Sequence, residues 1–486
     1  MKNSARPLLT AAEIRAVESR WFASGHNSFA LMRVAAAAVA EEALRMLPAG
    51  GRALVLCGPG NNGGDGHVAA AILQTRGIDV ARVQLGEVAE GDSARARELA
   101  EGVRLATEAD WQKADLLIDA LFGIGLARPL VGEAQALVEK ANHSGRPILS
   151  VDVPSGIDAD SGEVPGVAIQ AHSTVTFHTA KPGHLLLPGR LHCGQLRIAD
   201  IGLPAPLDST LWANGFGPWD LPRPVLGVHK YARGGVLVWS GPELQTGAAR
   251  LAASAALRVG AGAVTLAGDR AALRVHAAHL TAIMLAEADA AGFAELLTNA
   301  KIRAACIGPA AGPLAADVAE RALRTGTPLV LDADALTAFA GRAERLAELI
   351  RAHRRPVVLT PHEGEFQRLY PDLSGSRLQR ARAVAAHSGA IMVFKGGDGC
   401  IAAPDGRALI AANTVPWLAT AGSGDVLAGM IAGALAQGLD GFAACGLASW
   451  LHAELGTRLG AGLIAEDLIG RELQRLIAEL YQAAPD

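Results

Sequence analysis

The sequence predicts an α/β protein built from two successive domains, each a mostly parallel sheet covered by helices. Short apolar runs alternate with longer segments of helical spacing, which is typical of parallel sheets whose crossovers are helices. The 486 residues suffice for about three domains at roughly 150 residues each. A proline-rich stretch at 204–230 interrupts the alternation and suits a linker. We therefore expect one domain over residues 1–222 and another over 223–486.

The first half begins with helices and then alternates. Thr10 and Glu13 form a capping box, so a helix is expected to begin there, and an alanine-rich helix is expected over 29–46. Helical segments are expected over 93–106 and 133–143. The strand candidates between them are 53–57, 80–85, 116–119 and 148–152.

The second half repeats the alternation and then becomes helical. Its strand candidates are 236–239, 263–266, 304–307, 329–332, 357–360 and 391–395. Helices are expected over 424–437, 442–456 and 466–482. The two halves share an architecture but no motif, so an internal duplication is not supported.

Composition excludes several classes of function. The formal net charge of −4 argues against a nucleic-acid partner held by a broad basic face. The five cysteines are scattered without a Cys-x-x-Cys pair, which argues against a disulfide framework or a cysteine zinc site. The N-terminus is polar, and no apolar run approaches about 18 residues. We expect a soluble, cytoplasmic protein with no membrane partner.

The first glycine-rich segment, 58–66, follows an expected strand and opens an expected helix. Gly58, Gly60 and Gly63 satisfy G-x-G-x-x-G, and Asp79 lies about 20 residues further on, as in the Rossmann dinucleotide fingerprint. The sheet is thus expected to be Rossmann-like and doubly wound, and an NAD dehydrogenase is one interpretation. The following glycines, which would permit positive φ and a close approach to a ligand, favour a different nucleotide site.

Oxygen-bearing side chains follow two neighbouring strands of this half. Asp119 and Asp152 stand at expected strand ends, where ligands bind in open α/β sheets. With Asn62 and Ser155 they make a set of hard donors suited to an alkali or other hard cation. The alternative is that each aspartate caps the next turn.

A second glycine-rich segment, 420–425, opens the apolar helix of the other half. Gly422 and Gly424 let the backbone approach an anion, and the helix dipole attracts negative charge. Asp425, in the first turn, is placed to take a proton from a substrate hydroxyl during phosphoryl transfer. No P-loop motif is present. The alternative is a glycine-tolerant helix start with a favourable first-turn charge.

Three further segments of this half carry polar residues at strand ends. Lys395 begins a tight glycine turn, and His362 lies in a polar turn beside Glu363 and Glu365. The pair Asp332 and Asp334 suits either a magnesium–phosphate network or helix capping.

Residues 10–200 resemble the epimerase domain of NAD(P)H-hydrate repair enzymes, through segments 58–66, 119–126, 152–156 and 181–183. The resemblance implies that Asp152 is the acid/base group, with Lys181 as a second catalytic group. It implies potassium near Asn62, Asp119 and Ser155. It further implies that these residues surround the damaged nicotinamide nucleotide: Asn61, Asn62, Gly63, Gly64, Asp65, Gly123, Ile124, Gly125, Leu126, Ala127, Arg128, Pro129 and Asp152.

Residues 229–480 resemble the dehydratase domain of the same system, a member of the ribokinase-like superfamily. The resemblance implies that Ala252, His362 and Asp425 face the hydrated nucleotide. It implies ADP as co-substrate, with Mg²⁺, on these residues: Lys395, Gly396, Gly397, Asp398, Gly399 and Gly424. Two departures stand out: Ala310 replaces a usual glycine, and 280–284 lacks the usual Pro-Glu before Met284.

The expected activity is bifunctional repair, in which one domain equilibrates the R and S hydrates of NADH and NADPH and the other dehydrates the S form with ADP. Two alternatives remain open. One is a ribokinase-like small-molecule kinase with a regulatory nucleotide-binding domain. The other makes the first half a non-catalytic NAD-binding sensor. The sequence leaves a homo-oligomer open.

Overall fold

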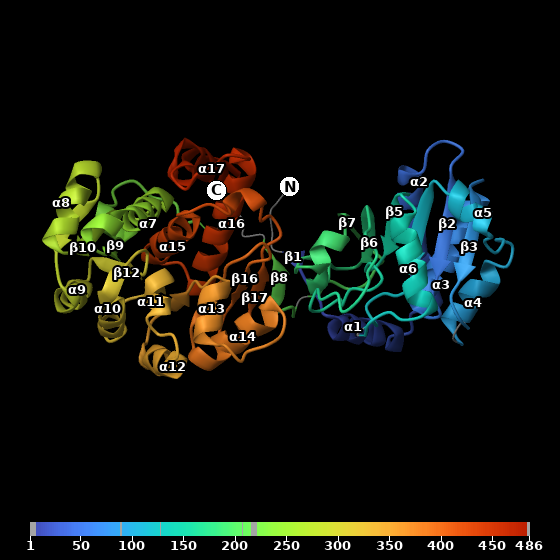
Figure 1. Ribbon diagram of the computed structural model, residues 1–486, viewed down its shortest axis with the longest axis horizontal. Coiled ribbons are helices and arrows are strands. Elements are labelled where there is room, and N and C mark those ends of the chain that lie inside the picture. The colour runs from blue at the N-terminus through green and yellow to red at the C-terminus, as the bar shows by residue number, and fades with distance from the viewer. Residues whose placement is uncertain (1–5, 88–89, 127, 207, 215–220, 484–486) are drawn as a thin grey trace. The chain divides into compact units, whose positions relative to one another are not determined.

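The chain, in a computed structural model that describes residues 6–87, 90–126, 128–206, 208–214 and 221–483, forms two compact units (Figure 1). One unit comprises Pro7–Ser209, and the other comprises Thr210–Asp486 with Met1–Arg6. The division falls before the expected boundary at 222/223, because β8 (Leu211–Ala213) pairs with β17 (Ala408–Ile410) in the sheet of the second unit.

The first unit contains a six-stranded sheet in the order β3-β2-β4-β5-β6-β7, with every neighbouring pair parallel. The strands are β2 (Arg52–Cys57), β3 (Asp79–Gln84), β4 (Leu116–Ala120), β5 (Ile148–Val151), β6 (Ser173–Phe177) and β7 (Gln195–Ala199). This is the flavodoxin-like order, not the 3-2-1-4-5-6 order of the dinucleotide fold, and it places the topological switch point between β2 and β4.

Helices cover both faces of this sheet, as the doubly wound prediction requires. Its helices are α1 (Ala11–Ala23), α2 (Ser28–Met46), α3 (Asn61–Thr75), α4 (Asp92–Leu99), α5 (Glu108–Lys113) and α6 (Glu133–His143). Along β2 the side chains alternate, so Val55 and Cys57 join the core under α2, α3 and α4. Leu54 and Leu56 join the opposite core under α5 and α6.

The second unit is built on an eleven-stranded sheet in the order β1-β8-β17-β16-β15-β14-β13-β12-β9-β10-β11. The pairings among strands β9 to β15 are all parallel, while β16 pairs antiparallel with β15 and β17. The strands not yet given are β1 (Arg6–Pro7), β9 (Gly235–Trp239), β10 (Ala263–Gly268), β11 (Met284–Glu287), β12 (Ile302–Ile307), β13 (Leu329–Leu331), β14 (Val357–Leu359), β15 (Ile391–Phe394) and β16 (Cys400–Ala402).

The core of this unit lies where helices pack on the sheet. Its helices are α7 (Thr246–Val259), α8 (Arg270–His279), α9 (Ala290–Leu297), α10 (Ala315–Ala322), α11 (Ala333–Thr337), α12 (Ala343–Ala352), α13 (Glu363–Leu369), α14 (Arg377–Ser388), α15 (Ser423–Ala436), α16 (Gly441–Leu459) and α17 (Arg471–Ala483). The apolar α15 packs closely on α7, because a Cβ at Gly429 would lie 2.1 Å from the carbonyl oxygen of Ala252. Glycine thus fixes the helix that opens at the second glycine segment.

The structure confirms the α/β prediction and most expected elements. The helix expected over 133–143 has those bounds, whereas α4 ends at Leu99 instead of 106. The first-unit strands β6 and β7 were not expected, although β6 is rich in β-branched residues. All five cysteines are buried and free. Among the described residues, no helix combines the length and apolarity needed to cross a membrane.

Candidate active sites

The first candidate site lies where β2, β4 and β5 end, beside the switch point of the sheet. The backbone N–H of Gly58 donates to the carbonyl of Ala120 at 2.9 Å, which joins the ends of β2 and β4. A Cβ at Gly58 would lie 1.8 Å from the carbonyl oxygen of Leu121, so only glycine fits there. This edge of an open sheet is where ligands bind.

The first glycine segment is helical from Asn61 onward, earlier than expected. Gly63, Gly64 and Gly66 lack the positive φ that the sequence analysis assigned to this turn. They are glycines for packing: a Cβ would lie 1.8 Å from the Gly58 carbonyl at Gly63 and 2.5 Å from the Ala120 side chain at Gly66. The first-turn N–H groups of α3 still lack helical partners and can face an anion.

The fingerprint carboxylate, Asp79, does not belong to this site. Asp79 is the first residue of β3 and stands beside Arg52, the first residue of β2, with an ion pair of 3.1 Å. A second ion pair joins it to Arg104 at 3.2 Å. The Asp79 carboxylate therefore lies at the amino ends of the parallel strands, whereas the candidate site lies at their carboxyl ends. An NAD dehydrogenase would need this carboxylate beside the ribose, so its position argues against that interpretation.

Asp119, near the end of β4, and Ser155, in the turn that follows β5, meet in a buried cluster. The Ser155 hydroxyl donates to Oδ1 of Asp119 at 2.6 Å, and the Ser155 N–H donates to Oδ2 at 2.9 Å. The hydroxyl of Ser150 adds a bond to Oδ2 at 2.8 Å, and the N–H of Leu121 a longer one to Oδ1 at 3.3 Å. Burial raises the pKa of Asp119, and these hydrogen bonds oppose the rise.

Asn62, the third predicted metal ligand, lies on the neighbouring turn. A Cβ at Gly123 would lie 3.0 Å from Oδ1 of Asn62 and 3.4 Å from Oδ2 of Asp152, so the two side chains meet there. The amide nitrogen Nδ2 of Asn62 is buried without a hydrogen-bond partner. All three donors are oxygen-bearing and carry a single negative charge between them, a set that fits an alkali cation.

Asp152 and Lys181 form a buried ion pair. Oδ1 of Asp152 accepts from Nζ of Lys181 at 2.6 Å and from the Thr176 hydroxyl at 2.9 Å. Lys181 is 1% exposed and Asp152 8% exposed, so the pair lies in a low-dielectric setting. Burial by itself raises the pKa of Asp152, but the ammonium outweighs it and the net pKa is lowered. Asp152 also has a φ of +64°, a left-handed conformation that is strained for a non-glycine residue.

His184, which the sequence analysis missed, connects the main chains of these two residues. Its Nδ1 accepts from the Lys181 N–H at 2.9 Å, and its Nε2 bonds the Asp152 carbonyl at 2.9 Å. The pattern requires the neutral ring with its proton on Nε2. Burial, helped by the Lys181 charge, lowers the pKa of His184 to about 4. The spacing Lys181-Pro-Gly-His184 was the available signal, since the structure forms a 3₁₀ turn there.

Two further carboxyl groups, those of Asp65 and Glu18, interact electrostatically with Asp152. Burial and the charges of Asp152 and Glu18 raise the pKa of Asp65 well above its usual range. Burial and Asp152 also raise the pKa of Glu18, a residue of α1 that was not predicted. The surroundings thus raise the pKa of Asp65 and lower that of Asp152. Active-site carboxyl pairs in which one group acts as acid and the other as base show the same separation of pKa values.

The segment after Gly123 supplies the remaining predicted contacts. Gly125, Arg128 and Pro129 are exposed, Ile124 and Leu126 are half-buried, and Ala127 lies outside the described residues. The guanidinium of Arg15 in α1 donates to the Ile124 carbonyl at 3.2 Å. The segment therefore offers an open surface beside Asn62 and Asp152.

The second candidate site lies at the start of α15. Gly422 has a φ of +85°, and a Cβ there would lie 2.6 Å from Leu251, so glycine is required. His452 of α16 holds the next residue, because its Nε2 lies 2.9 Å from the Ser423 hydroxyl and 3.0 Å from the Ser423 carbonyl. The first turn, with Gly424 and Asp425, is thereby fixed.

Asp425 has the electrostatics of a general base that works near neutral pH. Burial is the largest cause of a raised pKa at Asp425. The charges of Asp332, Glu365 and Asp334 raise the pKa further, while the charge of Lys395 lowers it. Together they raise the pKa of Asp425 to about 7. A carboxylate with this pKa takes a proton more readily than an ordinary aspartate.

Lys395 stands between β13 and the first turn of α15. Its Nζ donates to Oδ1 of Asp332 at 2.7 Å and lies 3.2 Å from where a Cβ of Gly424 would be. Burial opposes its charge, but Asp332 and Glu365 outweigh burial and raise the pKa of Lys395. Asp334 points elsewhere and accepts from the Gly312 N–H at 3.0 Å. The predicted Asp332–Asp334 pair is thus divided between an ion pair and a turn cap.

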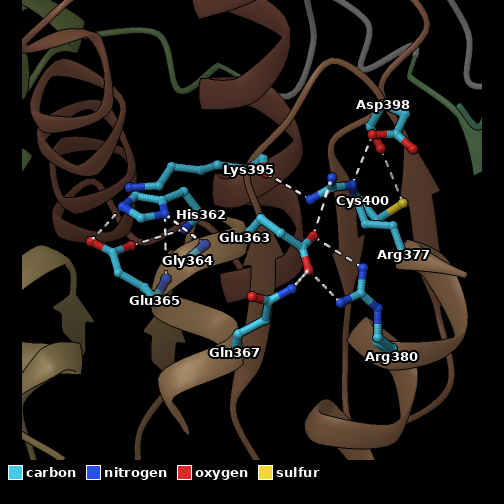
Figure 2. A network of polar contacts seen from close by, with 10 residues as sticks. All are labelled: His362, Glu363, Gly364, Glu365, Gln367, Arg377, Arg380, Lys395, Asp398 and Cys400. Carbon is cyan, nitrogen blue, oxygen red and sulfur yellow. Dashed lines mark hydrogen bonds and ion pairs between the residues drawn. The ribbon is translucent and has the colours of Figure 1, made fainter. Parts of the chain in front are cut away.

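His362 caps α13. Its Nδ1 accepts from the N–H groups of Gly364 at 3.0 Å and Glu365 at 3.3 Å, while Glu365 accepts from the His362 N–H at 2.9 Å (Figure 2). The side chain is 55% exposed, so it keeps a surface available to a ligand.

The predicted nucleotide loop, Lys395–Gly399, is hydrogen-bonded by Arg377 of α14. The carboxylate of Asp398 accepts from Nε of Arg377 at 2.8 Å and is nearly buried, so it serves the loop's own structure. Ala252 is fully buried against α15, and its contact with substrate stays a prediction. The structure brings Lys395, Gly424 and Asp425 together, and it adds Arg377 and His452, which no motif had indicated.

Comparison with known proteins places both halves in one family. Residues 28–183 match the model described as YjeF-related protein N-terminus, and residues 236–476 match NAD(P)H-hydrate dehydratase. The chain is 33% identical over 510 residues to the bifunctional NAD(P)H-hydrate repair enzyme Nnr of Synechocystis, covering 98% of this chain and 95% of the relative. The Nnr of Moorella thermoacetica is 37% identical over 441 residues, covering 83% and 82%.

Among solved structures, the ADP/ATP-dependent NAD(P)H-hydrate dehydratase of Bacillus subtilis is 29% identical. The superposition covers 55% of this chain and 95% of the Bacillus subtilis chain, with a TM-score of 0.45.

Proposed function

We propose residue roles from one premise: the chain belongs to the family of bifunctional NAD(P)H-hydrate repair enzymes. It is an NAD(P)H-hydrate epimerase and dehydratase. We assign epimerisation to the unit with Asp152 and dehydration to the unit with Asp425. These assignments follow the two family matches, which fall in separate units.

The observation that carries the dehydratase proposal is the meeting of Lys395, Gly424 and Asp425 at a helix start. The N–H groups of α15 and the Lys395 ammonium offer positive potential to the terminal phosphate of an adenine nucleotide, which we take to be ADP. Asp425, whose pKa is about 7, would take the proton of the ring hydroxyl. His362 and Glu365 line the neighbouring turn.

The proposed reaction balances in two steps. The ring hydroxyl oxygen attacks the terminal phosphorus of ADP as Asp425 accepts its proton, and AMP leaves. The carbon–oxygen bond then breaks, phosphate departs with the bonding pair, and the adjacent carbon loses a proton to restore the ring double bond. The products are NAD(P)H, AMP and phosphate.

Mg²⁺ fits this site as a companion of the nucleotide. Among the described residues, no group of three or more carboxylate, imidazole or thiol side chains forms a ready metal site. Asp332 is nearby, and Mg²⁺ commonly uses one or two carboxylates together with substrate phosphates. When bound, the ion would neutralise phosphate charge, while Asp332 would keep Lys395 in place.

For the epimerase site, we propose that Asp152 acts as the base and Lys181 keeps it ionised. Epimerisation breaks the carbon–oxygen bond beside the ring nitrogen and re-forms it on the other face, which needs one group to give a proton and one to take it. Asp65, whose pKa is raised, suits the donor role. Potassium beside Asn62, Asp119 and Ser155 would supply local positive charge near the substrate.

One assay tests the dehydratase proposal. Purified protein is mixed with NAD(P)H hydrates and ADP with Mg²⁺, and loss of hydrate absorbance is followed together with phosphate release. We expect both signals, and Asp425→Asn should lower kcat by about a hundredfold or more with ADP affinity within about tenfold. A stable phosphorylated product would instead favour the kinase alternative. Full activity of Asp425→Asn would remove Asp425 from the mechanism.

Potassium is tested separately by thermal unfolding in KCl against NaCl at equal ionic strength. We expect KCl to raise the melting temperature of the first unit, and Asn62→Ala to remove the difference. Equal melting in the two salts would contradict a potassium site.

A further inference from the structure

The loop Lys395–Gly399 depends on an arginine outside it. Arg377 is the first residue of α14 and is 17% exposed at its side chain. Its Nε donates to Oδ1 of Asp398 at 2.8 Å, and its NH1 donates to the Lys395 carbonyl at 2.9 Å. One planar guanidinium thus ties both ends of the loop (Figure 2).

The arginine is itself fixed on three sides. Its Cζ lies 4.4 Å from the ring centre of Phe394, the residue before the loop, and its NH2 lies 3.4 Å from Glu363. A Cβ at Gly396 would lie 2.8 Å from Cζ of Arg377, so the guanidinium fills the space under that glycine. The two hydrogen bonds of the guanidinium, its stacking on Phe394 and its close approach to Gly396 together constrain the conformation of the loop.

The same network reaches the other ligand-binding turn. Arg380, one turn further along α14, grips Glu363 with two bonds of 2.6 and 3.0 Å. Glu363 follows His362, so α14 holds the turn that carries the proposed substrate contact. Among the described contacts, Arg380 donates to no residue of the loop (Figure 2), although its Cζ also lies 4.9 Å from the ring centre of Phe394. Its side chain is 15% exposed, close to that of Arg377. It is a matched neighbour with a different attachment.

We propose that Arg377 is a positioning residue that holds the loop Lys395–Gly399 in its nucleotide-binding shape. This rests on the proposed nucleotide site. Arg377 acts through the loop backbone and Asp398, and the contacts described for its half-buried guanidinium are with Asp398, Lys395, Phe394 and Glu363, not with Asp425. Its loss should therefore weaken nucleotide binding, because the loop must be ordered by the ligand, and should spare the chemical step.

The test measures ADP affinity by calorimetry and kinetic constants for ADP in the full-length enzyme and in Arg377→Gln, Arg377→Lys and Arg380→Gln. We expect Arg377→Gln to raise Kd and KM for ADP about tenfold or more while kcat changes less than about threefold. Arg377→Lys should be intermediate, because one ammonium cannot bond both ends of the loop. Arg380→Gln should leave ADP affinity near that of the parent enzyme.

Thermal unfolding of each variant separates positioning from general destabilisation. If Arg377→Gln and Arg380→Gln lose similar stability and raise KM for ADP alike, or if Arg377→Gln binds ADP as the parent does, the proposal is overturned. Failure of the parent enzyme to bind ADP would instead overturn the nucleotide site itself.

Gly396→Ala supplies a second route should Arg377→Gln fail to fold. Its methyl group would displace the guanidinium, so it should raise KM for ADP in the parent enzyme. In the Arg377→Lys background, where the fork is already absent, it should add less than about half that effect in free-energy terms. Full additivity would show that the glycine acts independently of Arg377 and would contradict the proposal.

Discussion

At the residue scale, the immediate neighbours of each candidate group set its pKa. Asp152 is buried and Asp425 half-buried, and a lysine charge acts on each, yet their pKa values move in opposite directions. Lys181 bonds Asp152 directly, whereas Lys395 bonds Asp332 and leaves Asp425 among other carboxylates. The partner of the lysine, and not the type of residue, sets which aspartate is ionised at lower pH.

The pKa of about 7 for Asp425 predicts the pH dependence of dehydration. A base must be deprotonated, so kcat/KM for the hydrate should rise with pH through about 7 and level off above it. The measurement is a pH–rate profile at saturating ADP and Mg²⁺. A profile that is flat from pH 5.5 to 8.5 would contradict the base assignment.

Ala310 offers a test of backbone strain. Its φ of +47° lies in the left-handed region, which costs a non-glycine residue about 1–2 kcal/mol. Glycine loses about 0.5–1 kcal/mol through its freer unfolded chain, so Ala310→Gly should stabilise the second unit by about 0.5–1 kcal/mol. Urea unfolding is the measurement. Its control is Ala311→Gly, at a φ of −68°, which should destabilise.

At the element scale, the position of the first turn of α15, which carries the proposed base Asp425, depends on how that helix packs. Small residues bring α15 against α7, and Gly422, Gly429 and Gly433 each stand where a Cβ would overlap a neighbour. The helix start that carries Asp425 is thus fixed from its far end as well as by His452. A site of this kind is only as precise as the helix that carries it.

Gly429→Ala should show this dependence. The new Cβ would overlap the Ala252 carbonyl, so we expect a loss of about 1–3 kcal/mol in unfolding free energy and a fall in dehydratase kcat. Gly247→Ala in α7 is the matched control, because its Cβ would meet no atom within 4 Å. That variant should keep activity and gain up to about 1 kcal/mol from helix propensity. Equal stability of the two variants would refute close packing at Gly429.

At the scale of the whole molecule, two complete sheets carry two sites on one chain. The residues proposed for epimerisation all lie within Pro7–Ser209, and those proposed for dehydration all lie within Thr210–Asp486. Each activity should therefore be removable without the other. Joining the two activities serves the chemistry, since the proposed dehydratase uses one epimer and the epimerase supplies it from the other.

Asp152→Asn should separate the activities. With a mixture of R and S hydrates, ADP and Mg²⁺, the variant should consume the S portion at the normal rate and then slow to the uncatalysed epimerisation rate. The hydrate absorbance of the parent enzyme should instead decay to completion in one phase. A single complete phase for Asp152→Asn would mean that Asp152 is not needed for epimerisation.

Much of the fold followed from local pattern. Alternating apolar and helical segments located most strands, and the expected 133–143 helix was right to the residue. Strands β6, β7 and β8 were missed, as were β1, β11, β16 and β17, because short strands carry weak local signals. The strand order was also beyond reach, since it depends on which buried faces meet and not on any one segment.

The sequence by itself determined the two α/β halves, the family resemblance and the two glycine segments with their aspartates, because these are local patterns of spacing and residue type. Only the tertiary structure decided that Gly63 and Gly66 serve packing and that Asp79 lies at the amino ends of the strands. It also decided that His184 bonds the main chains of Lys181 and Asp152, and that Arg377 bonds the loop Lys395–Gly399. These facts arise from contacts between residues far apart in the chain. The pKa of each carboxyl was likewise decided there, because it depends on burial and on which charges folding brings near.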